Sequence, residues 1–119
     1  MEKSLKKEIE SRLDISKICP LEYAMRIIGG KWKIRIIVSI GEEKNIRYNE
    51  LKRTVYGITD MVLSSSLKEL VKDGVIERVQ FNEIPPRVEY SLTEVGETLI
   101  PALLEITKWG KVQLEKKML

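Results

Sequence analysis

The chain has 119 residues, 33% of them charged and 43% hydrophobic, which is typical of one folded domain with a modest core rather than of a disordered protein. Its net charge of +3 is a mild basic bias. Histidine is absent and cysteine occurs once, which excludes the commonest general base, Cys/His zinc sites and an internal disulfide. Gly29-Gly30-Lys31 lacks the spacing of a phosphate-binding P-loop. We therefore expect no enzyme, no cofactor and no metal.

The sequence carries no sign of a membrane span or a secretory signal. Its longest apolar stretch, residues 34–40, is interrupted by Arg35 and Ser39. Residues 1–17 are charged throughout and lack the apolar segment of a signal peptide. Together with the lone cysteine, these features predict a cytoplasmic protein that does not contact membranes.

The N-terminal segment, residues 3–13, is predicted to form a helix with one narrow apolar stripe, made by Leu5, Ile9 and Leu13. Such a stripe on an otherwise charged helix needs a partner surface, and we expect a second copy of the chain to supply it. The alternative is that the helix folds back on its own domain.

Two further helices are predicted before the middle of the chain. Pro20 suits the first turn of a helix that ends at Gly29-Gly30. Lys31 then begins a segment, continuing to Ile40, that is apolar nearly all round and should be the central buried helix. The predicted buried face of the first of these helices consists of Leu21, Ala24, Met25 and Ile28.

A short strand at 45–47 precedes a predicted pair of helices joined by a turn at Tyr56-Gly57. The first helix runs from Tyr48 to about Thr54, with Leu51 and Val55 inward. The second begins after Thr59, a good N-cap, and ends at Gly74. Its spacing predicts a core face of Leu63, Leu67, Leu70 and Val71 and an outward face of Asp60, Met61, Ser64, Ser65 and Lys68. This arrangement is how proteins present one helix to the DNA major groove.

A hairpin follows the helix pair. Residues 75–81 and 88–92 are rich in β-branched and aromatic side chains, and the loop between them ends in two prolines. Carrying Arg78 and Arg87, the hairpin is interpreted as a wing that contacts the neighbouring DNA backbone. The basic excess lies on the helices before and within the helix pair, not on the hairpin: residues 26–68 hold nine basic and four acidic side chains, although an ordinary solvated face would explain this excess as well.

Thr93 is the predicted cap of a last helical region, in which Pro101 should kink or restart the helix. Beyond Pro101 an apolar stripe made by Leu103, Ile106, Trp109 and Val112 is predicted to join the dimer interface. Trp32, Tyr90 and Trp109 lie on apolar faces, so we expect them to pack in cores rather than to stack on bases.

The predicted fold class is α+β, mostly α: a winged helix-turn-helix with extra terminal helices that form a dimer interface. Its parts are an N-terminal dimerisation helix at 1–18, the DNA-binding core at 19–92 and a C-terminal helical region at 93–119 that contributes to the dimer.

Four motifs in series resemble the HxlR-type winged helix-turn-helix regulators of bacteria and archaea. They are CPLEYAMRIIGGKWK, IRYNELKR, GITDMVLSSSLKELVKDGVIERV and PPRVEYSLTEVGETLIP, and they cover about Cys19 to Trp109. The resemblance implies a small dimeric transcription factor, either a repressor or an activator, whose terminal helices form the dimer. The chain departs from the family pattern at Asp60-Met61, where the family often carries a polar or basic residue.

We assign DNA-contacting roles from this reading. The recognition set is Met61, Ser64, Ser65 and Lys68, whose side chains can meet base edges, with a solvated helix face as the alternative. Asp60 is left out because phosphates would repel it. The backbone set is Lys31, Arg47, Lys52 and Arg53. On the wing, Arg78 and Arg87 suit a narrow minor groove, unless Arg87 pairs with Glu77 or Glu89.

Cys19 directly precedes a predicted helix, and the partial positive charge at the N-terminus of a helix favours the thiolate form of a cysteine. Some members of the family it resembles sense oxidants or electrophiles through a cysteine near this end, which makes Cys19 a candidate redox sensor; the alternative, which an isolated cysteine favours, is a small buried hydrophobe. The function predicted is a homodimeric regulator on a pseudo-palindromic double-stranded DNA operator, with recognition helices about 34 Å apart. A winged-helix module that binds only protein partners and a carboxylate-only enzyme are the alternatives, and a small-molecule effector is left open.

Overall fold

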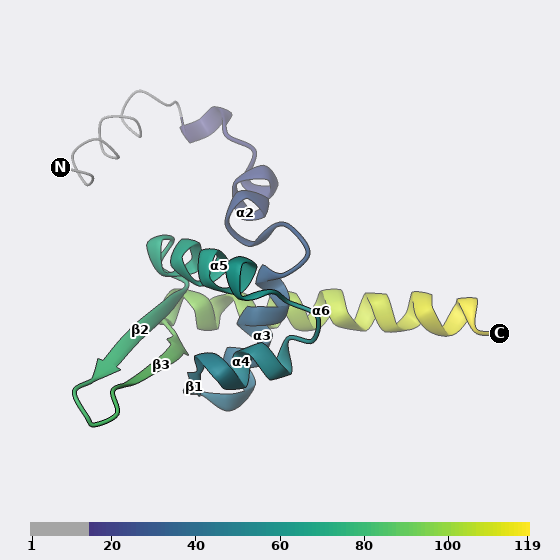
Figure 1. The fold of residues 1–119 in the computed structure, drawn as a ribbon. Coiled ribbons are helices and arrows are strands. Elements are labelled where there is room, and N and C mark those ends of the chain that lie inside the picture. Colours follow the sequence, from purple (N-terminus) through teal and green to yellow (C-terminus); the bar gives the residue numbers. More distant parts are fainter. Residues whose placement is uncertain (1–14) are drawn as a thin grey trace.

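The computed structural model describes residues 15–119 (Figure 1). The helix predicted at 3–13, with Leu5, Ile9 and Leu13, lies outside these residues. The described elements, in chain order, are η1 (Ile15–Lys17), α2 (Pro20–Ile28), α3 (Lys33–Glu43), β1 (Ile46–Arg47), α4 (Tyr48–Thr54), α5 (Asp60–Lys72), β2 (Ile76–Phe81), β3 (Arg87–Leu92) and α6 (Glu94–Lys117).

The core is built around α3, as the near-continuous apolar run predicted. Ile36, Ile37 and Ile40 are fully buried, and Leu63 and Leu67 of α5 pack in the same core. The helix begins at Lys33 rather than Lys31, because Gly30 turns the chain with a φ of 95° and Trp32 takes the N-cap position. This core gives α5 a rigid support.

The turn between α4 and α5 and both ends of α5 are formed by the residues that the sequence predicted. Gly57 has a φ of 89°, a backbone conformation that residues with a Cβ rarely adopt. The Thr59 hydroxyl accepts a hydrogen bond of 3.2 Å from the Val62 N–H and caps α5 as predicted. At the other end of α5, Gly74 leaves the helix with a φ of 74°.

The three strands form one small antiparallel sheet in the order β1-β3-β2. The predicted short strand and both hairpin strands are therefore confirmed. The buried Tyr90 of β3 anchors the sheet to the core, whereas the far end of the hairpin projects from the body (Figure 1). The hairpin thus stands beside α5 as a wing.

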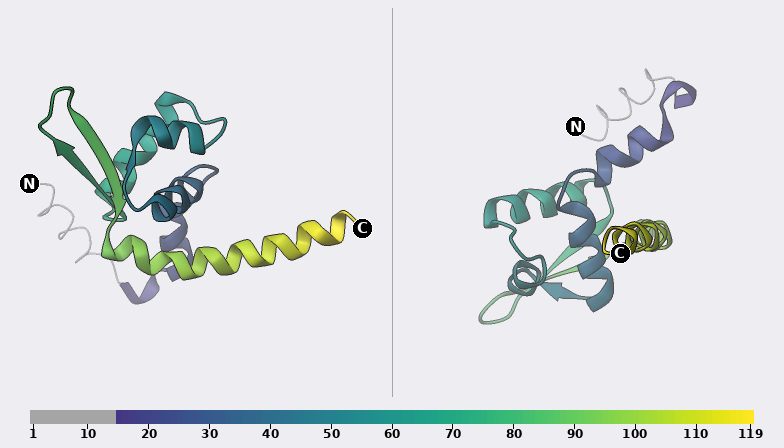
Figure 2. Two further views of the ribbon diagram at one scale, coloured as in Figure 1. Left: turned by 90° about the horizontal axis from the view of Figure 1, so that it is seen from below. Right: turned by 90° about the vertical axis from the view of Figure 1, so that its right-hand side faces the viewer.

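The C-terminal helix α6 runs unbroken from Glu94 to Lys117 with Pro101 inside it, so of the two predicted outcomes, a kink or a restart, the restart is wrong and the kink stays a prediction. Proline removes only its own N–H from the hydrogen-bond ladder, and the remaining bonds carry the helix past it. The Thr93 hydroxyl caps α6 by accepting from the Gly96 N–H at 3.1 Å. The first half of α6 packs on the body through Leu103, and the second half extends clear of it (Figures 1 and 2).

The buried face predicted for α2 is wrong for the single chain. Leu21 is 70% exposed, Met25 is 49% exposed, and only Ile28 of this helix is buried. The reason is that α2 meets the body at its C-terminal end alone and otherwise stands away from it (Figure 2).

These elements are those of a winged helix-turn-helix in the α+β class, mostly α, as predicted. Helices α4 and α5 form the helix-turn-helix, the β2–β3 hairpin forms the wing, and α2 and α6 are additional to both. Across residues 15–119, no helix combines the length and apolar character that a bilayer crossing requires.

Candidate nucleic-acid interface

The outer face of α5 carries the side chains predicted to point away from the core. Met61 is 82% exposed, Ser65 and Lys68 are exposed, and Ser64 is half-buried. Val71 was predicted to be core but is 38% exposed, because the edge of α5 nearest the hairpin is left uncovered. The prediction for Val71 is therefore wrong, and α5 offers a wider outer face than its leucine spacing indicated.

An ion pair fixes α5 to the start of α3. The Lys33 ammonium contacts the Glu69 carboxylate and, by hydrogen bond and by charge, lowers the pKa of Glu69. With the leucines of α5 buried beneath it, this pair holds the helix in one orientation. A preorganised helix loses little conformational freedom when it binds, which favours recognition.

Tyr48 is the polar centre of the helix-turn-helix, and the sequence analysis did not single it out. Its hydroxyl donates to the Asp60 carboxylate at 2.9 Å, and its oxygen also lies 3.2 Å from the Asp60 carbonyl and 3.3 Å from the Ser64 hydroxyl. The first residue of α4 is thereby tied to two turns of α5. Asp60 and Ser64 lie 12 and 16 positions after Tyr48 in the sequence, so no local spacing predicts these contacts. The one available signal was a tyrosine at the start of a helix.

Lys52 completes this cluster. Its ammonium lies 3.4 Å from the Asp60 carboxylate, and the Tyr48 hydroxyl followed by Lys52 lowers the pKa of Asp60. Asp60 is thus held ionised, with its charge compensated inside the protein. The same pairing means that Lys52, predicted as a backbone contact, already has an anionic partner in the protein alone.

The remaining cations predicted to meet the DNA backbone surround the same face. Arg47 and Arg53 are exposed at the two ends of α4. The Lys31 ammonium lies 4.7 Å from the ring centre of the half-buried Trp32, which packs against the core as predicted. Arg35 stacks on the same ring and donates to the Tyr56 carbonyl at 3.0 Å, which secures the turn before α5.

The two arginines of the hairpin lie on opposite faces of it. Arg78 pairs across the strands with the buried Tyr90, which places it on the side toward α5. Arg87 pairs with Phe81 on the other side. The hairpin therefore cannot present both arginines to one groove in the same way.

Arg87 is engaged within the hairpin, which was the alternative reading of this residue. Its guanidinium lies 3.4 Å from the Glu83 carboxylate and 3.6 Å from that of Glu89, and it stacks over the Phe81 ring at 4.1 Å. Glu77, the other partner considered, instead accepts from the Ser91 hydroxyl at 3.1 Å. In the free protein Arg87 rigidifies the wing.

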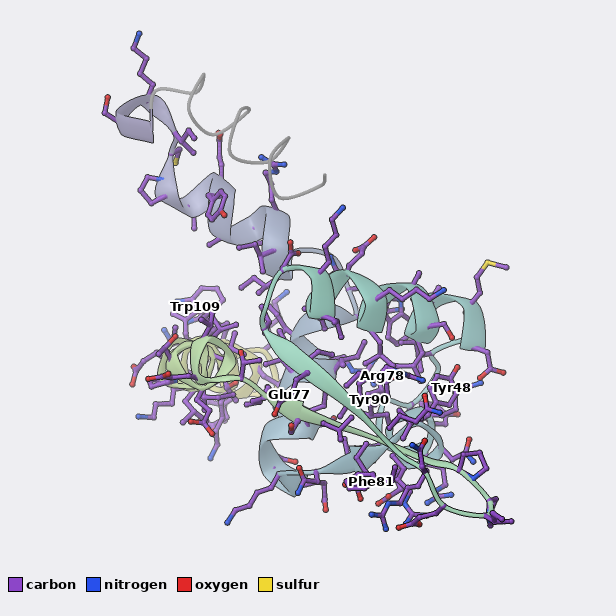
Figure 3. The ribbon with its side chains drawn as sticks, turned by 90° about the vertical axis from the view of Figure 1, so that its left-hand side faces the viewer. Tyr48, Glu77, Arg78, Phe81, Tyr90 and Trp109 are labelled. Carbon is purple, nitrogen blue, oxygen red and sulfur yellow. The ribbon has the colours of Figure 1, made fainter. Side chains whose placement is uncertain are left out.

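A hollow of about 440 Å³ separates α5 from the hairpin. Figure 3 shows Tyr48, Arg78 and Tyr90 gathered beneath α5 at this place, with Trp109 away from them on α6. The residues that line the hollow are Tyr48, Ser64, Leu67, Lys68, Val71, Arg78 and Tyr90. Three of the residues assigned to DNA, Ser64 and Lys68 on α5 and Arg78 on β2, therefore line one concave site.

A second surface, on α2 and α6, is apolar and uncovered. Trp109 is 68% exposed, so the prediction that it packs in a core is wrong, while Ile106 and Val112 are exposed along with it. Leu103, predicted to join a dimer interface, is 2% exposed inside its own domain, because this part of α6 packs on α3; it has no surface to offer a second chain. The rest of the predicted α6 stripe faces outward.

Cys19 is exposed at the N-cap position of α2. The alternative that it is a buried small hydrophobe is therefore wrong, since α2 stands away from the core.

The chain is similar in sequence and in structure to known transcriptional regulators. The helix-turn-helix regulator YdzF of Bacillus subtilis is 49% identical over 98 residues, which are 82% of this chain and 90% of that protein. The structure of a MarR-family transcriptional regulator from Porphyromonas gingivalis W83 matches with a TM-score of 0.75 and 45% identity, covering 80% of this chain and 92% of the other. The reduced form of the redox regulator HypR matches with a TM-score of 0.78 and 37% identity, covering 84% and 98%. The model of the HxlR-like helix-turn-helix family matches residues 27–118, and the chain belongs to that family.

Proposed function

We propose that the protein is a cytoplasmic homodimeric transcriptional regulator that binds double-stranded DNA sequence-specifically, with α5 in the major groove and the hairpin over the adjacent backbone or minor groove. The observation that carries this proposal is the outer face of α5: polar and exposed, rigidly supported by buried leucines, and flanked by a projecting hairpin. Membership of a family whose relatives are transcriptional regulators supports it.

The outer face of α5 can read base edges without strong selectivity at any one position. Ser64 and Ser65 can donate to or accept from any base, Met61 can contact a thymine methyl, and Lys68 can reach guanine or a phosphate. Specificity in this proposal comes from several modest contacts repeated in two half-sites. Arg47, Arg53 and Lys31 hold the backbone and set the register of α5 in the groove.

A second copy of the chain covers the apolar surface of α2 and α6. Side chains such as Leu21, Ile106 and Trp109 are exposed in the single chain, and a symmetric pair would bury them on both copies at once. The pair then places two α5 helices about one turn of DNA apart, roughly 34 Å, on a pseudo-palindromic operator. Binding near a promoter would block or recruit polymerase.

The test is a titration of the protein against genomic fragments at two salt concentrations. We expect tight binding to a small set of fragments, with an association constant that falls steeply as salt rises, because each phosphate contact releases counterions. No binding at low salt would contradict the proposal and would favour a module that contacts protein partners only.

Cys19 supports a second candidate function, a thiol switch on the same regulator. It is the single cysteine and is exposed at the start of α2, beside the proposed dimer surface, and one structural relative is described as a redox regulator. Oxidation or alkylation there would alter how two copies meet. We expect Cys19→Ser to bind DNA as tightly as the reduced parent, whereas a mild oxidant changes the affinity of the parent alone. Equal responses of the two proteins to oxidant would rule the switch out.

A further inference from the structure

We propose that the hollow between α5 and the hairpin is a phosphate site, which holds one phosphodiester of the DNA strand that separates the major groove from the minor groove. The inference rests on the proposed function and deepens it. It assigns Lys68, for which the proposed function allowed guanine or a phosphate, and Arg78, for which the sequence suggested the minor groove, to the same backbone phosphate.

The charges at the mouth of the hollow call for an anion. Lys68 and Arg78 both line it and both are exposed, and within residues 15–119 no carboxylate lies within ion-pair distance of either. Other cations of the domain, Lys33, Lys52 and Arg87 among them, do have carboxylate partners. Two uncompensated cations at one concave site repel each other, and a phosphate between them would turn this repulsion into two charge-assisted contacts.

A hydroxyl donor is available at the same place. The single proton of the Tyr48 hydroxyl is used by Asp60, so the Tyr48 oxygen can only accept from the Ser64 hydroxyl, 3.3 Å away. Ser64 can rotate its proton from Tyr48 to a phosphate oxygen without leaving a donor unpaired. An unpaired Asp60 carboxylate would repel a phosphate, but Lys52 forms an ion pair with it and the Tyr48 hydroxyl donates a hydrogen bond to it. The cluster around Tyr48 thus makes this end of the hollow tolerant of an anion.

The floor of the hollow keeps its charges in position. Leu67 and Tyr90 are buried, and Arg78 lies opposite Tyr90 in the strand register, so both side chains are on the face of the hairpin that lines the hollow. An apolar floor beneath charged ends holds the cationic groups at the opening, where a phosphate can reach them.

The geometry of duplex DNA points to the same occupant. When a helix lies in the major groove and a hairpin lies over the neighbouring minor groove, the backbone strand between these grooves must pass between the two elements. In this protein the space between α5 and the hairpin is that hollow, and two of its lining residues, Lys68 and Arg78, are exposed. The occupant is therefore the backbone strand, contacted through one phosphate in each half-site.

Lys68→Gln and Arg78→Gln test the assignment first by salt dependence. A duplex of the tightest fragment from the genomic titration serves as the probe. The slope of log affinity against log salt is negative, and its magnitude counts the phosphates that the protein neutralises. Because Lys68 and Arg78 share one phosphate, we expect each variant to reduce this magnitude by at most about 0.9 per half-site, with the same loss on unrelated duplexes. Lys111→Gln, which removes an exposed cation from the far half of α6, is the matched control and should keep the slope of the parent. Slopes unchanged in both hollow variants would overturn the proposal.

A scan with single methylphosphonates, which neutralise one phosphate at a time, then locates the contact. One position in each half-site should weaken binding by the parent and by Lys111→Gln, yet cause a smaller loss for Arg78→Gln, in which only Lys68 still contacts that phosphate, and no further loss when Lys68→Gln and Arg78→Gln are combined. The absence of any such position overturns the phosphate site while leaving DNA binding intact. Failure of the parent to bind any duplex would instead sink the proposed function itself.

Inorganic phosphate, compared with chloride at equal ionic strength, separates the backbone from a free anion. With the backbone as occupant, phosphate should displace the duplex from the parent no better than chloride does. Stronger displacement by phosphate that disappears in Arg78→Gln, together with no methylphosphonate position coupled to Arg78, would identify a free anion site and overturn the assignment to the backbone.

Discussion

The two working surfaces of this domain differ in how far a single chain completes them. On the α4–α5 side, two acidic groups have partners inside the chain: Asp60 contacts Tyr48 and Lys52, and Glu69 contacts Lys33. On the α2–α6 side, large apolar groups such as Leu21 and Trp109 face water. One chain therefore carries a finished reading surface, whereas the placement of that surface on DNA depends on what covers the apolar one.

The contrast also separates the physics of the two surfaces. The polar side is stabilised by short-range hydrogen bonds and exposed ion pairs, each of which contributes about 1 kcal/mol or less. The apolar side gains stability in proportion to the area removed from water, at about 25 cal/mol per Å², and aromatic anchors contribute most at such contacts. Perturbing the apolar side should therefore have the larger effect.

Trp109→Glu is expected to have the largest effect. A carboxylate at the centre of the proposed contact would be desolvated without a partner, so we expect the dimer to weaken by about 2 kcal/mol or more, roughly 30-fold in its dissociation constant. Sedimentation across a concentration series measures this change directly. Because Trp109 is 68% exposed, the fold of the single chain should survive, as circular dichroism would show.

Trp109→Phe keeps an aromatic ring at the same place and is the control, with dimerisation close to that of the parent. An unchanged dimer in Trp109→Glu would place the contact elsewhere and remove the contrast between the two surfaces. A parent that sediments as a monomer at micromolar concentration would remove it altogether.

The parts of the fold that the sequence predicted well are those governed by neighbouring residues. The cap at Thr59, the glycine turns at Gly57 and Gly74 and the period of the α5 leucines all depend on a few consecutive positions, and each is confirmed. Predictions failed where burial depends on contact with another element that is distant in sequence. Val71 and Leu21 have the spacing of core residues, but no other part of the described chain covers them.

In the candidate site, too, the features that depend on local spacing were predicted and those that depend on tertiary contacts were not. The outward face of α5 follows from its period, so Met61 and Ser65 were predicted correctly to be exposed. The Tyr48 cluster, in contrast, joins residues of two helices that are distant in sequence. Arg78 and Arg87 lie on opposite faces of the hairpin because of the strand register, which no sequence motif predicts. Their roles therefore became visible only once the elements were placed in space.

Thr59→Ala is expected to have an intermediate effect and tests whether the α4–α5 side is as self-sufficient as its contacts indicate. Losing the hydrogen bond to the Val62 N–H should lower the free energy of unfolding by about 1 kcal/mol, measured by urea denaturation. The control is Thr54→Ala, in which the lost hydroxyl only donates to the Glu50 carbonyl of the same helix and the expected change is within about 0.5 kcal/mol. Equal losses in the two variants would mean that the start of α5 is stabilised by something other than its cap.

Asp60→Asn should have the smallest effect, one that depends on pH. The Tyr48 hydroxyl, and after it Lys52, lowers the pKa of Asp60 in the folded protein. A carboxyl with a lowered folded pKa stabilises the fold above its unfolded pKa, and this contribution is lost as the pH falls through the folded value. The parent should therefore exceed Asp60→Asn in unfolding free energy by a small constant amount from pH 6 to 8, and the difference should close below about pH 4.

Tyr48→Phe, which removes the first of the two partners, should reproduce part of this profile. If the curves of parent and Asp60→Asn instead run parallel through the acid range, the cluster is a crowding of polar groups without electrostatic coupling, and the polar surface is less complete in the single chain than its distances indicate.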